Sequence, residues 1–433
     1  MSAPVPTAVA AEPRDWDPAA PAKRRSERRL LAASRPLAWF LLHGIVRNRR
    51  DVVRIPRLGY VITGAVACRE AAVDSEHFRK DGPKSAGALL TQVMGKTALL
   101  NMEGPDHVAL RRRLQGLFTP KFVNELADRA LSPIAAEVVA DLEAGKTIDV
   151  SMLARRVTGT MMCHMVGLRL EGEAREKRAR DMYKLGQKLV GMVPTNMKEL
   201  DQSQEDAAKA VFEQLVDGID EVHADGDENT IPGRLRELGF DLEETRGVVG
   251  MLLIAGTETT STALVRITSL LHDTSQWKRL QRNRDLLDNA IEEGLRCATP
   301  VPVSTRTSAK DFTFHGKKIR KNELVLIAWA RAIRDDRVIE RGTDFDISRE
   351  IPRELRLIWF GAGPHFCLGY NLAMRELTTV FTALLDGAPE FEIIKRRAAK
   401  KVLLPTWDEL LIRRTGGAVQ PGAAASVTAG AGA

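Results

Sequence analysis

Residues 360–369 read FGAGPHFCLG, and this stretch decides how the rest of the 433-residue chain is interpreted. It fits the pattern Phe-x-x-Gly-x-x-x-Cys-x-Gly at Phe360, Gly363, Cys367 and Gly369. A chain with 13 Phe, 33 Gly and 4 Cys would match this pattern by chance about 0.0007 times, so chance does not explain the match.

A helix is predicted directly after Cys367. Gly387 and Pro389 end it, and its apolar residues recur at helical spacing: Leu372, Ala373, Leu377, Val380, Phe381, Leu384 and Leu385. A Cys at a helix N-terminus has its thiolate favoured by unpaired amides and the helix dipole. Gly363 and Gly369 would let the backbone approach a flat macrocycle closely. The alternative, a buried free Cys in a glycine-rich turn, does not account for four matched positions.

The loop resembles the haem-ligand loop of the cytochrome P-450 family. The resemblance implies a mainly α fold with small β-sheets, the triangular helical haem domain of that family. It also implies haem b, with Cys367 as the axial ligand of the haem iron. O2 would be the co-substrate, and NAD(P)H would supply electrons indirectly through redox partners.

A second chemically distinctive stretch lies inside a helix predicted over residues 244–271, which is apolar nearly all round and therefore buried. The run AGTETTST at 255–262 interrupts that pattern with hydroxyls and one acid. It is similar to the family's motif Ala/Gly-Gly-x-Asp/Glu-Thr-Thr/Ser, matched at Ala255, Gly256, Glu258, Thr259 and Thr260.

The resemblance assigns roles within this run. Thr259 would place its hydroxyl at the oxygen site, and Glu258 would pass protons in from solvent. Gly256 would remove bulk where dioxygen must fit, and Ala255 lies one turn from Thr259 on the same side. A helix bent by Ser and Thr with a satisfied Glu is the structural alternative.

Four basic residues are expected to hold the haem propionates. His107 and Arg111 are four apart at the start of a predicted helix, so they share one face. The family carries a His and an Arg at this spacing for that purpose, and the resemblance adds Arg306 and His365. Without the resemblance, His107 and Arg111 would be an ordinary helix-surface pair.

Glu293 and Arg296, in IEEGLR, fit the family's Glu-x-x-Arg, and Arg349 is the expected third member of a buried structural ion network. By itself the pair would be a common surface salt bridge. The expected role of the network is folding and haem retention.

The substrate pocket is expected to be apolar. The stretch 82–100 resembles the family's segment over the distal haem face, and a hairpin near 402–414 could bring its tip to the pocket. The candidate residues are Leu89, Leu90, Val93, Met94, Leu252, Val301, Val303 and Trp407. They fit a hydrophobic small molecule such as a terpenoid, steroid, fatty acid or polyketide.

Composition limits the alternatives. The net charge is +7, but Lys and Arg are interleaved with 57 acids, which favours a mixed surface over a nucleic-acid stripe. Four widely spaced Cys predict neither disulfides nor a zinc site, and a reducing cytoplasm fits best. The apolar run at 36–46 is too short to cross a bilayer, so no transmembrane segment is expected, although this run could touch a membrane.

The expected organisation is a disordered lead-in at 1–28, a single haem domain at 29–414, and a disordered Gly/Ala-rich tail at 415–433. The chain would be a cytoplasmic monomer without a fused reductase. A separate ferredoxin or flavodoxin with its reductase would deliver electrons to a positive face formed by Arg112 and Arg113 with Arg349, Arg353 and Arg356.

The predicted function is that of a monooxygenase, which hydroxylates or epoxidises a hydrophobic small molecule with one oxygen atom from O2. One rival is a peroxide-driven peroxygenase or an isomerase, which would not need Glu258 and Thr259. A second rival is a non-catalytic haem-binding carrier or sensor.

Overall fold

The computed structural model describes residues 25–34, 50–56, 58–83, 86–192 and 200–416. Helix α1 begins at Arg25, so residues 25–28, predicted to be disordered, are helical. The remainder of the predicted lead-in, the apolar run at 36–46 and residues 417–433 of the predicted tail lie outside the described residues. The last strand ends at Thr415.

Most of the described chain is helical, as predicted. The α-helices are α1 (Arg25–Ser34), α3 (Ala65–Val73), α4 (Ala86–Met94), α5 (Gly104–Leu114), α6 (Pro120–Glu143), α7 (Val150–Met165), α8 (Gly172–Met192), α9 (Gln202–Leu215), α10 (Ile219–Asp225), α11 (Ile231–Glu237), α12 (Leu242–Asp273), α13 (Trp277–Arg282), α14 (Leu287–Cys297), α15 (Trp329–Ala332) and α16 (Tyr370–Gly387). The 3-10 helices are η2 (Leu99–Asn101), η3 (Gln115–Phe118), η4 (Arg284–Leu286), η5 (Ile358–Phe360) and η6 (Gly363–His365).

The strands form small sheets. They are β1 (Val52–Ile55), β2 (Gly59–Ile62), β3 (Phe78–Arg79), β4 (Thr147–Asp149), β5 (Ser304–Ser308), β6 (Phe312–Phe314), β7 (Lys317–Ile319), β8 (Leu324–Ile327), β9 (Glu390–Ala398) and β10 (Trp407–Thr415). Among the described residues the sheet orders are β1-β2-β8-β5-β3, β4-β10-β9 and β6-β7. Within the described strands, only the β2–β8 pair is parallel. The hairpin predicted near 52–63 is present as β1–β2. The hairpin predicted near 402–414 lies earlier in the chain, since residues 407–415 form one strand, β10, which pairs with β9 at residues 390–398.

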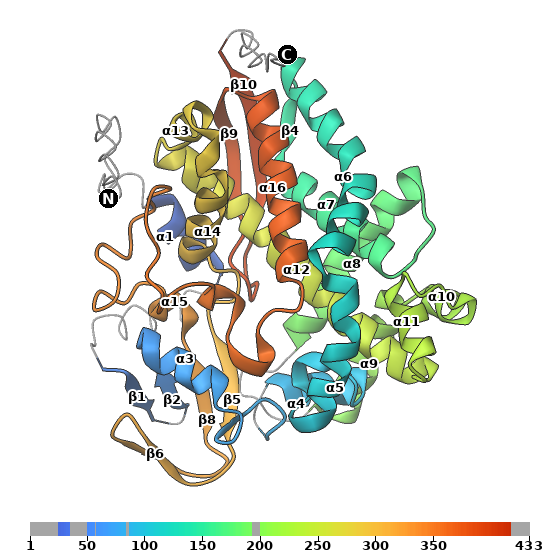
Figure 1. Cartoon of the computed structure of the whole chain (residues 1–433), viewed down its shortest axis with the longest axis vertical. Helices are drawn as coiled ribbons and strands as arrows, with labels where there is room; N and C mark the ends of the chain where they lie inside the picture. Colours follow the sequence, from blue (N-terminus) through green and yellow to red (C-terminus); the bar gives the residue numbers. More distant parts are fainter. Residues whose placement is uncertain (1–24, 35–49, 57, 84–85, 193–199, 417–433) are drawn as a thin grey trace, which may run out of the picture.

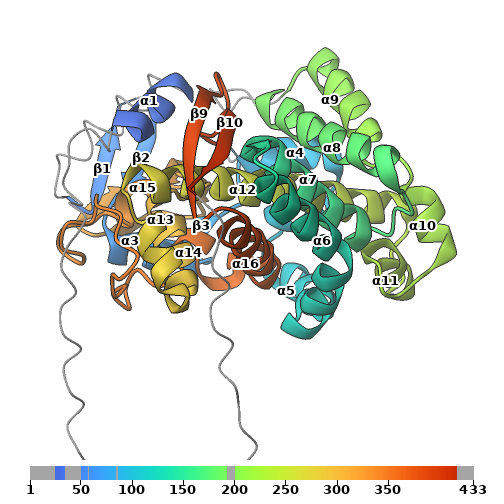
Figure 2. The same ribbon diagram turned by 90° about the horizontal axis from the view of Figure 1, so that it is seen from above.

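Helix α12 crosses the middle of the molecule, between a strand-bearing half with β1, β2, β5 and β8 and a helical half with α6 to α11 (Figures 1 and 2). Its start is fixed by a capping box, in which Asp241 and Glu244 each accept a hydrogen bond from the other's backbone amide. Within the described residues it is the one helix long and apolar enough to span a bilayer, but 72% of its most apolar window is buried in the protein. It is therefore the core helix that the sequence predicts.

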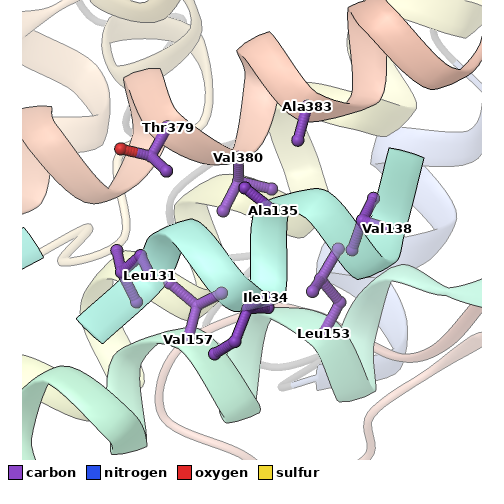
Figure 3. Close-up of a pocket in the computed structure, with 9 residues that line it drawn as sticks. All are labelled: Leu131, Ile134, Ala135, Val138, Leu153, Val157, Thr379, Val380 and Ala383. Atoms are coloured by element: carbon purple, nitrogen blue, oxygen red, sulfur yellow. The ribbon is translucent and has the colours of Figure 1, made fainter. Parts of the chain in front are cut away.

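Helix α16 follows the Cys loop, which is the stretch 360–369, and ends at Gly387, as predicted. It packs beside α6 and α7, and the three helices enclose a small apolar cavity of about 10 Å³ (Figure 3). The cavity is lined by Leu131, Ile134, Ala135, Val138, Leu153, Val157, Thr379, Val380 and Ala383. A water needs at least about 10–15 Å³ and several polar partners, so this cavity is a packing defect and not a binding site.

Candidate active site

The Cys loop holds the thiol of Cys367 at the approach to α16. The Cys367 amide donates to Phe360 O at 2.9 Å, which closes the loop, and the Phe360 ring meets Tyr370 edge-on at 5.0 Å. Burial raises the pKa of the Cys367 thiol, while the Gly369 amide, Arg111 and Lys80 oppose that rise. The sulfur thus faces donors and cations that favour a thiolate once a metal replaces the proton.

The two glycines of the loop have different surroundings. Gly363 has φ +65°, and a Cβ there would come within 2.7 Å of Val73 Cα, so the residue is required for packing against α3. A Cβ at Gly369 would meet only the Cys367 sulfur, at 4.0 Å. Close approach to a flat ligand therefore does not explain Gly363.

Basic side chains from separate elements gather beside the Cys loop. His107 on α5 is 1% exposed, and its ring stacks on His365 with centroids 4.3 Å apart. Arg111, one turn along α5, donates to Phe366 O, and the charge of the Cys367 thiolate acts on it. Arg306 on β5 is 3% exposed.

The gathered charge is mostly positive. Burial lowers the pKa of Arg306 to about 10, with Glu103 as the opposing acid. Burial also lowers the pKa of His365 to about 4, although Glu103 Oε1 lies 3.2 Å from His365 Nε2. Lys80, whose charge acts on Arg306, Arg111 and Cys367, also has its pKa lowered by burial. Sequence reasoning missed Lys80 and Glu103, which no local pattern marks.

The arrangement fits a haem. Among the described residues, His107 Nδ1 and His365 Nε2 are buried without a hydrogen-bond partner of good geometry. Buried donors and cations in excess over acids are what two propionates would compensate. The Cys367 thiol belongs to the same loop as His365, and a thiolate is a donor that a haem iron would accept.

One face of helix α12 does not pack against the core and is accessible to solvent; this face is called the accessible stripe. Its buried middle is interrupted at Leu252, Ala255, Gly256 and Thr259, which are partly or fully exposed and lie at helical spacing on one face. The predicted oxygen-site residues Ala255 and Thr259 therefore share a face. Thr259 Oγ1 donates to Ala255 O at 2.7 Å, so the hydroxyl is anchored to the helix backbone.

Gly256 and Glu258 contact the neighbouring helices α7 and α8. A Cβ on Gly256 would lie 2.6 Å from Met162 Sδ, so the glycine serves the packing of α12 on α7 and not only room for dioxygen. Glu258 is 4% exposed, and its Oε1 accepts from Gln187 Nε2 at 3.3 Å. Burial raises the pKa of Glu258, and the Gln187 hydrogen bond opposes this.

Glu293, Arg296 and Arg349 lie together. Glu293 and Arg296 are both 0% exposed and form a two-pronged pair at 2.6 and 2.8 Å. Arg349 Nε lies 3.1 Å from Glu293 Oε1 with 14% of its side chain exposed. Arg349 therefore faces inward and does not belong to the positive face, where Arg112, Arg113, Arg353 and Arg356 are exposed.

The substrate-pocket candidates are placed unevenly. Leu252 lies on the accessible stripe of α12, and the end of α4 packs near it, since a Cβ on Gly247 would meet Met94 O at 2.3 Å. On α4, Leu90 is partly buried, Val93 and Met94 are buried, and the Leu89 side chain lies outside the described residues. Before β5, Val301 is exposed and Val303 partly buried.

The structure places the Trp407 ring in the core, beside Arg396. Trp407 begins β10, is 4% exposed, and packs under the guanidinium of Arg396, 5.4 Å from the ring centre. Arg396 pairs with Asp273 at the end of α12. At about 1.5 Å per residue, that end lies about 20 Å along the helix from Thr259, so the ring does not reach the stripe.

Comparison with known proteins identifies the chain. The family model for "Cytochrome P450" matches residues 55–402. The chain belongs to the cytochrome P450 family. This P450 is 31% identical over 295 residues to luteothin monooxygenase of Streptomyces thioluteus, covering 66% of this chain and 70% of the relative. It is 29% identical to cytochrome P450 CYP107DY1 of Priestia megaterium, covering 72% and 75%.

Solved structures agree on the fold. The hydroxylase HmtN superposes with a TM-score of 0.73 at 23% identity, covering 89% of this chain and 98% of HmtN. The predicted P450 fold is confirmed. This P450 is a haem-thiolate monooxygenase, an oxidoreductase that uses O2 and receives electrons from redox partners.

Proposed function

We propose that the Cys367 sulfur ligates the haem iron, and that His107, Arg111, Arg306 and His365 hold the propionates. The observation that carries this is that the Cys367 thiol, with cations acting on it, belongs to the same loop as His365, whose ring stacks on His107, where the buried Nδ1 has no hydrogen-bond partner among the described residues. Lys80 lies in the same region, interacting electrostatically with Arg306, Arg111 and Cys367. When bound, haem supplies the oxygen activation, and the chain supplies orientation and protons.

The residues of α12 divide the remaining work. Thr259 presents its hydroxyl on the accessible stripe, where it orients a hydrogen bond toward the oxygen site, and Glu258 supplies the protons. Leu252, with Leu90 and Val303, provides apolar walls that exclude water. The substrate is a hydrophobic small molecule of the terpenoid, steroid, fatty acid or polyketide kind.

Electrons come from NAD(P)H through an acidic ferredoxin or flavodoxin and its reductase. Arg112, Arg113, Arg353 and Arg356 are exposed and give the partner a positive face. The enzyme works as a cytoplasmic monomer.

Carbon monoxide binding to the reduced protein tests the ligand. The expected result is the red-shifted Soret band of thiolate ligation, lost in Cys367→Ser and kept in Cys163→Ser, which alters a buried cysteine on α7. A normal Soret shift in Cys367→Ser would overturn the assignment. A panel of terpenoids, steroids and fatty acids, followed by the Soret change on binding, would then sort the substrate class.

Turnover separates the rivals. Thr259→Ala and Glu258→Gln should raise the NAD(P)H consumed per product. Unchanged coupling in both would favour the peroxygenase. A protein that binds CO but turns over with no redox pair would be a carrier or sensor.

A further inference from the structure

Helix α1 carries an acid that reaches the core of the molecule. Glu27, in the first turn of α1, accepts a hydrogen bond from Arg266 Nη2 on α12. The Glu27 side chain is 19% exposed and that of Arg266 3%, so the ion pair is largely buried. Leu30, one turn further along α1, is 0% exposed, and Lys401 N donates to Ser34 O at 3.0 Å. Helix α1 is therefore docked along its length.

Arg266 needs this acid because another cation lies near it. Among the described residues, Glu27 is the acid that pairs with Arg266. Burial lowers the pKa of Arg334, and in addition the Glu27 charge raises that pKa while the Arg266 charge lowers it, so both act on Arg334. The Arg334 guanidinium donates to the carbonyl oxygens of Ala330 and Cys297, which carry no charge. Without Glu27, Arg266 would be a buried charge without a counter-charge, which is strongly destabilising.

Arg266 also holds the segment that follows α14. Its Nη1 donates to Thr299 O at 3.4 Å. Near the other end of this segment, Ala330 N on α15 donates to Pro302 O at 2.9 Å. Residues 298–303 are thus fixed from α12 at the start and from α15 at the end.

The same segment leads to the proposed site. It contains Val303, which belongs to the proposed apolar wall, and it continues into β5, where Arg306 lies. At about 1.5 Å per residue, Arg266 is roughly 10 Å along α12 from Thr259. Glu27 is therefore connected to the wall through two hydrogen bonds of one arginine.

We propose that Glu27 and Arg266 are positioning residues for the substrate: Glu27 neutralises Arg266, and Arg266 fixes the backbone of residues 298–303 and with it Val303. This inference rests on the proposed wall at Val303. When the ion pair is lost, the Arg266 guanidinium turns toward water, and its hydrogen bond to Thr299 O is lost with it. The wall then moves more freely, although no residue at the oxygen site has changed.

Two azoles measure the position of the wall in the haem-loaded full chain. Imidazole and 4-phenylimidazole both place a ring nitrogen on the haem iron and shift the Soret band, but only the second adds a phenyl group that contacts the wall. Glu27→Leu should raise the Kd of 4-phenylimidazole about fourfold, the effect of one lost contact of methylene size. The Kd of imidazole should stay unchanged.

Amide hydrogen exchange reads the segment directly. The Ala330 amide donates to Pro302 O, so it reports on the support of residues 298–303. In Glu27→Leu its exchange should be about tenfold faster, because the segment loses a hydrogen bond from a charged donor. Glu27→Gln, which keeps an acceptor oxygen but no charge, should give a smaller change in the same direction.

A double-mutant cycle shows whether Glu27 acts through Arg266. Arg266→Met should have the same effects on its own, and Glu27→Leu should add nothing in that background, since the buried charge is already gone. Glu390→Leu is the matched control, because it breaks an exposed pair with Lys278 on the neighbouring strand β9. It should behave as wild type. CO spectra confirm that each variant is folded and loaded.

Equal Ala330 exchange, or an equal ratio of the two Kd values, in Glu27→Leu and Glu390→Leu would overturn the inference. Additive effects of Glu27→Leu and Arg266→Met would overturn it too. Val303→Ala separates this from failure of the proposed function. If Val303→Ala leaves the Kd ratio unchanged, the proposed wall is wrong. If it changes the ratio while Glu27→Leu does not, only the inference about Glu27 is wrong.

Discussion

Replacing Glu376 by Gln should stabilise the protein at alkaline pH and not at acid pH. Glu376 on α16 is 1% exposed, and burial raises the pKa of its carboxyl group to about 8. The Thr260 hydroxyl opposes the shift, but neither carboxylate oxygen has a hydrogen-bond partner of good geometry among the described residues.

The sign follows from proton binding. Between the ordinary pKa of 4.5 and about 8, the unfolded chain has released this proton while the folded protein keeps it, so the free energy of unfolding falls as the pH rises. Below 4.5 and above 8 the contribution is constant. The 3.5-unit gap corresponds to about 5 kcal/mol, of which roughly 4 kcal/mol develops between pH 5 and pH 8.5.

Urea unfolding of the haem-loaded protein at several pH values measures this effect. Glutamine has nearly the same shape and stays neutral, so the stability of Glu376→Gln relative to wild type should rise by roughly 3–4 kcal/mol from pH 5 to pH 8.5. Contributions of the haem common to both proteins cancel. Glu350→Gln, at an exposed carboxyl group, is the control and should follow wild type. A difference that does not change with pH would refute the reasoning.

Three further predictions concern packing and charge. Glu293→Gln leaves Arg296 buried without its counter-charge and should cost about 3–5 kcal/mol, read as a lower urea midpoint and faster haem loss, with Arg353→Ala as the unaffected control. Val157→Ile adds one methyl group to the cavity of Figure 3 and should raise the free energy of unfolding by up to about 0.8 kcal/mol, whereas Ala383→Leu overfills it and should lower that energy by about 1–3 kcal/mol. The rate of electron transfer from an acidic ferredoxin should fall steeply as the salt concentration rises. Arg353→Ala should make this salt dependence weaker, whereas Arg349→Ala, at an inward-facing residue, should leave it unchanged. Equal salt dependence in wild type and Arg353→Ala would contradict a docking role.

The features that the sequence predicted correctly are those carried by local patterns. Helical periodicity with Gly387 gave α16, and a long apolar run with polar residues near 258 gave the core helix α12. The Cys loop and the Glu-x-x-Arg pair have fixed spacings within one element, so their residues lie where the spacing implies.

Local sequence patterns did not predict the register of the strands or the packing partners of single side chains. Trp407 was placed at a hairpin tip, but the strand begins at this residue, which turns its ring under Arg396. Arg349 was assigned both to the buried ion network and to the positive face, and its contact with Glu293 agrees with the network. Gly256 and Gly363 were predicted to leave room for a ligand, whereas a Cβ atom at either position would meet Met162 or Val73.

The side chains around Glu258 show why such sites escape sequence reading. Gln187 precedes Glu258 by 71 residues, and Asp408 follows Arg155 by 253. Gln187, Arg155, Asp408 and Tyr183 belong to no recognised motif. They contact one another, and Gln187 contacts Glu258, only once α7, α8 and β10 have packed against α12. Because Glu258 is fixed by its own helix while the side chains around it come from other elements, the surroundings of this acid cannot be predicted from the α12 sequence alone.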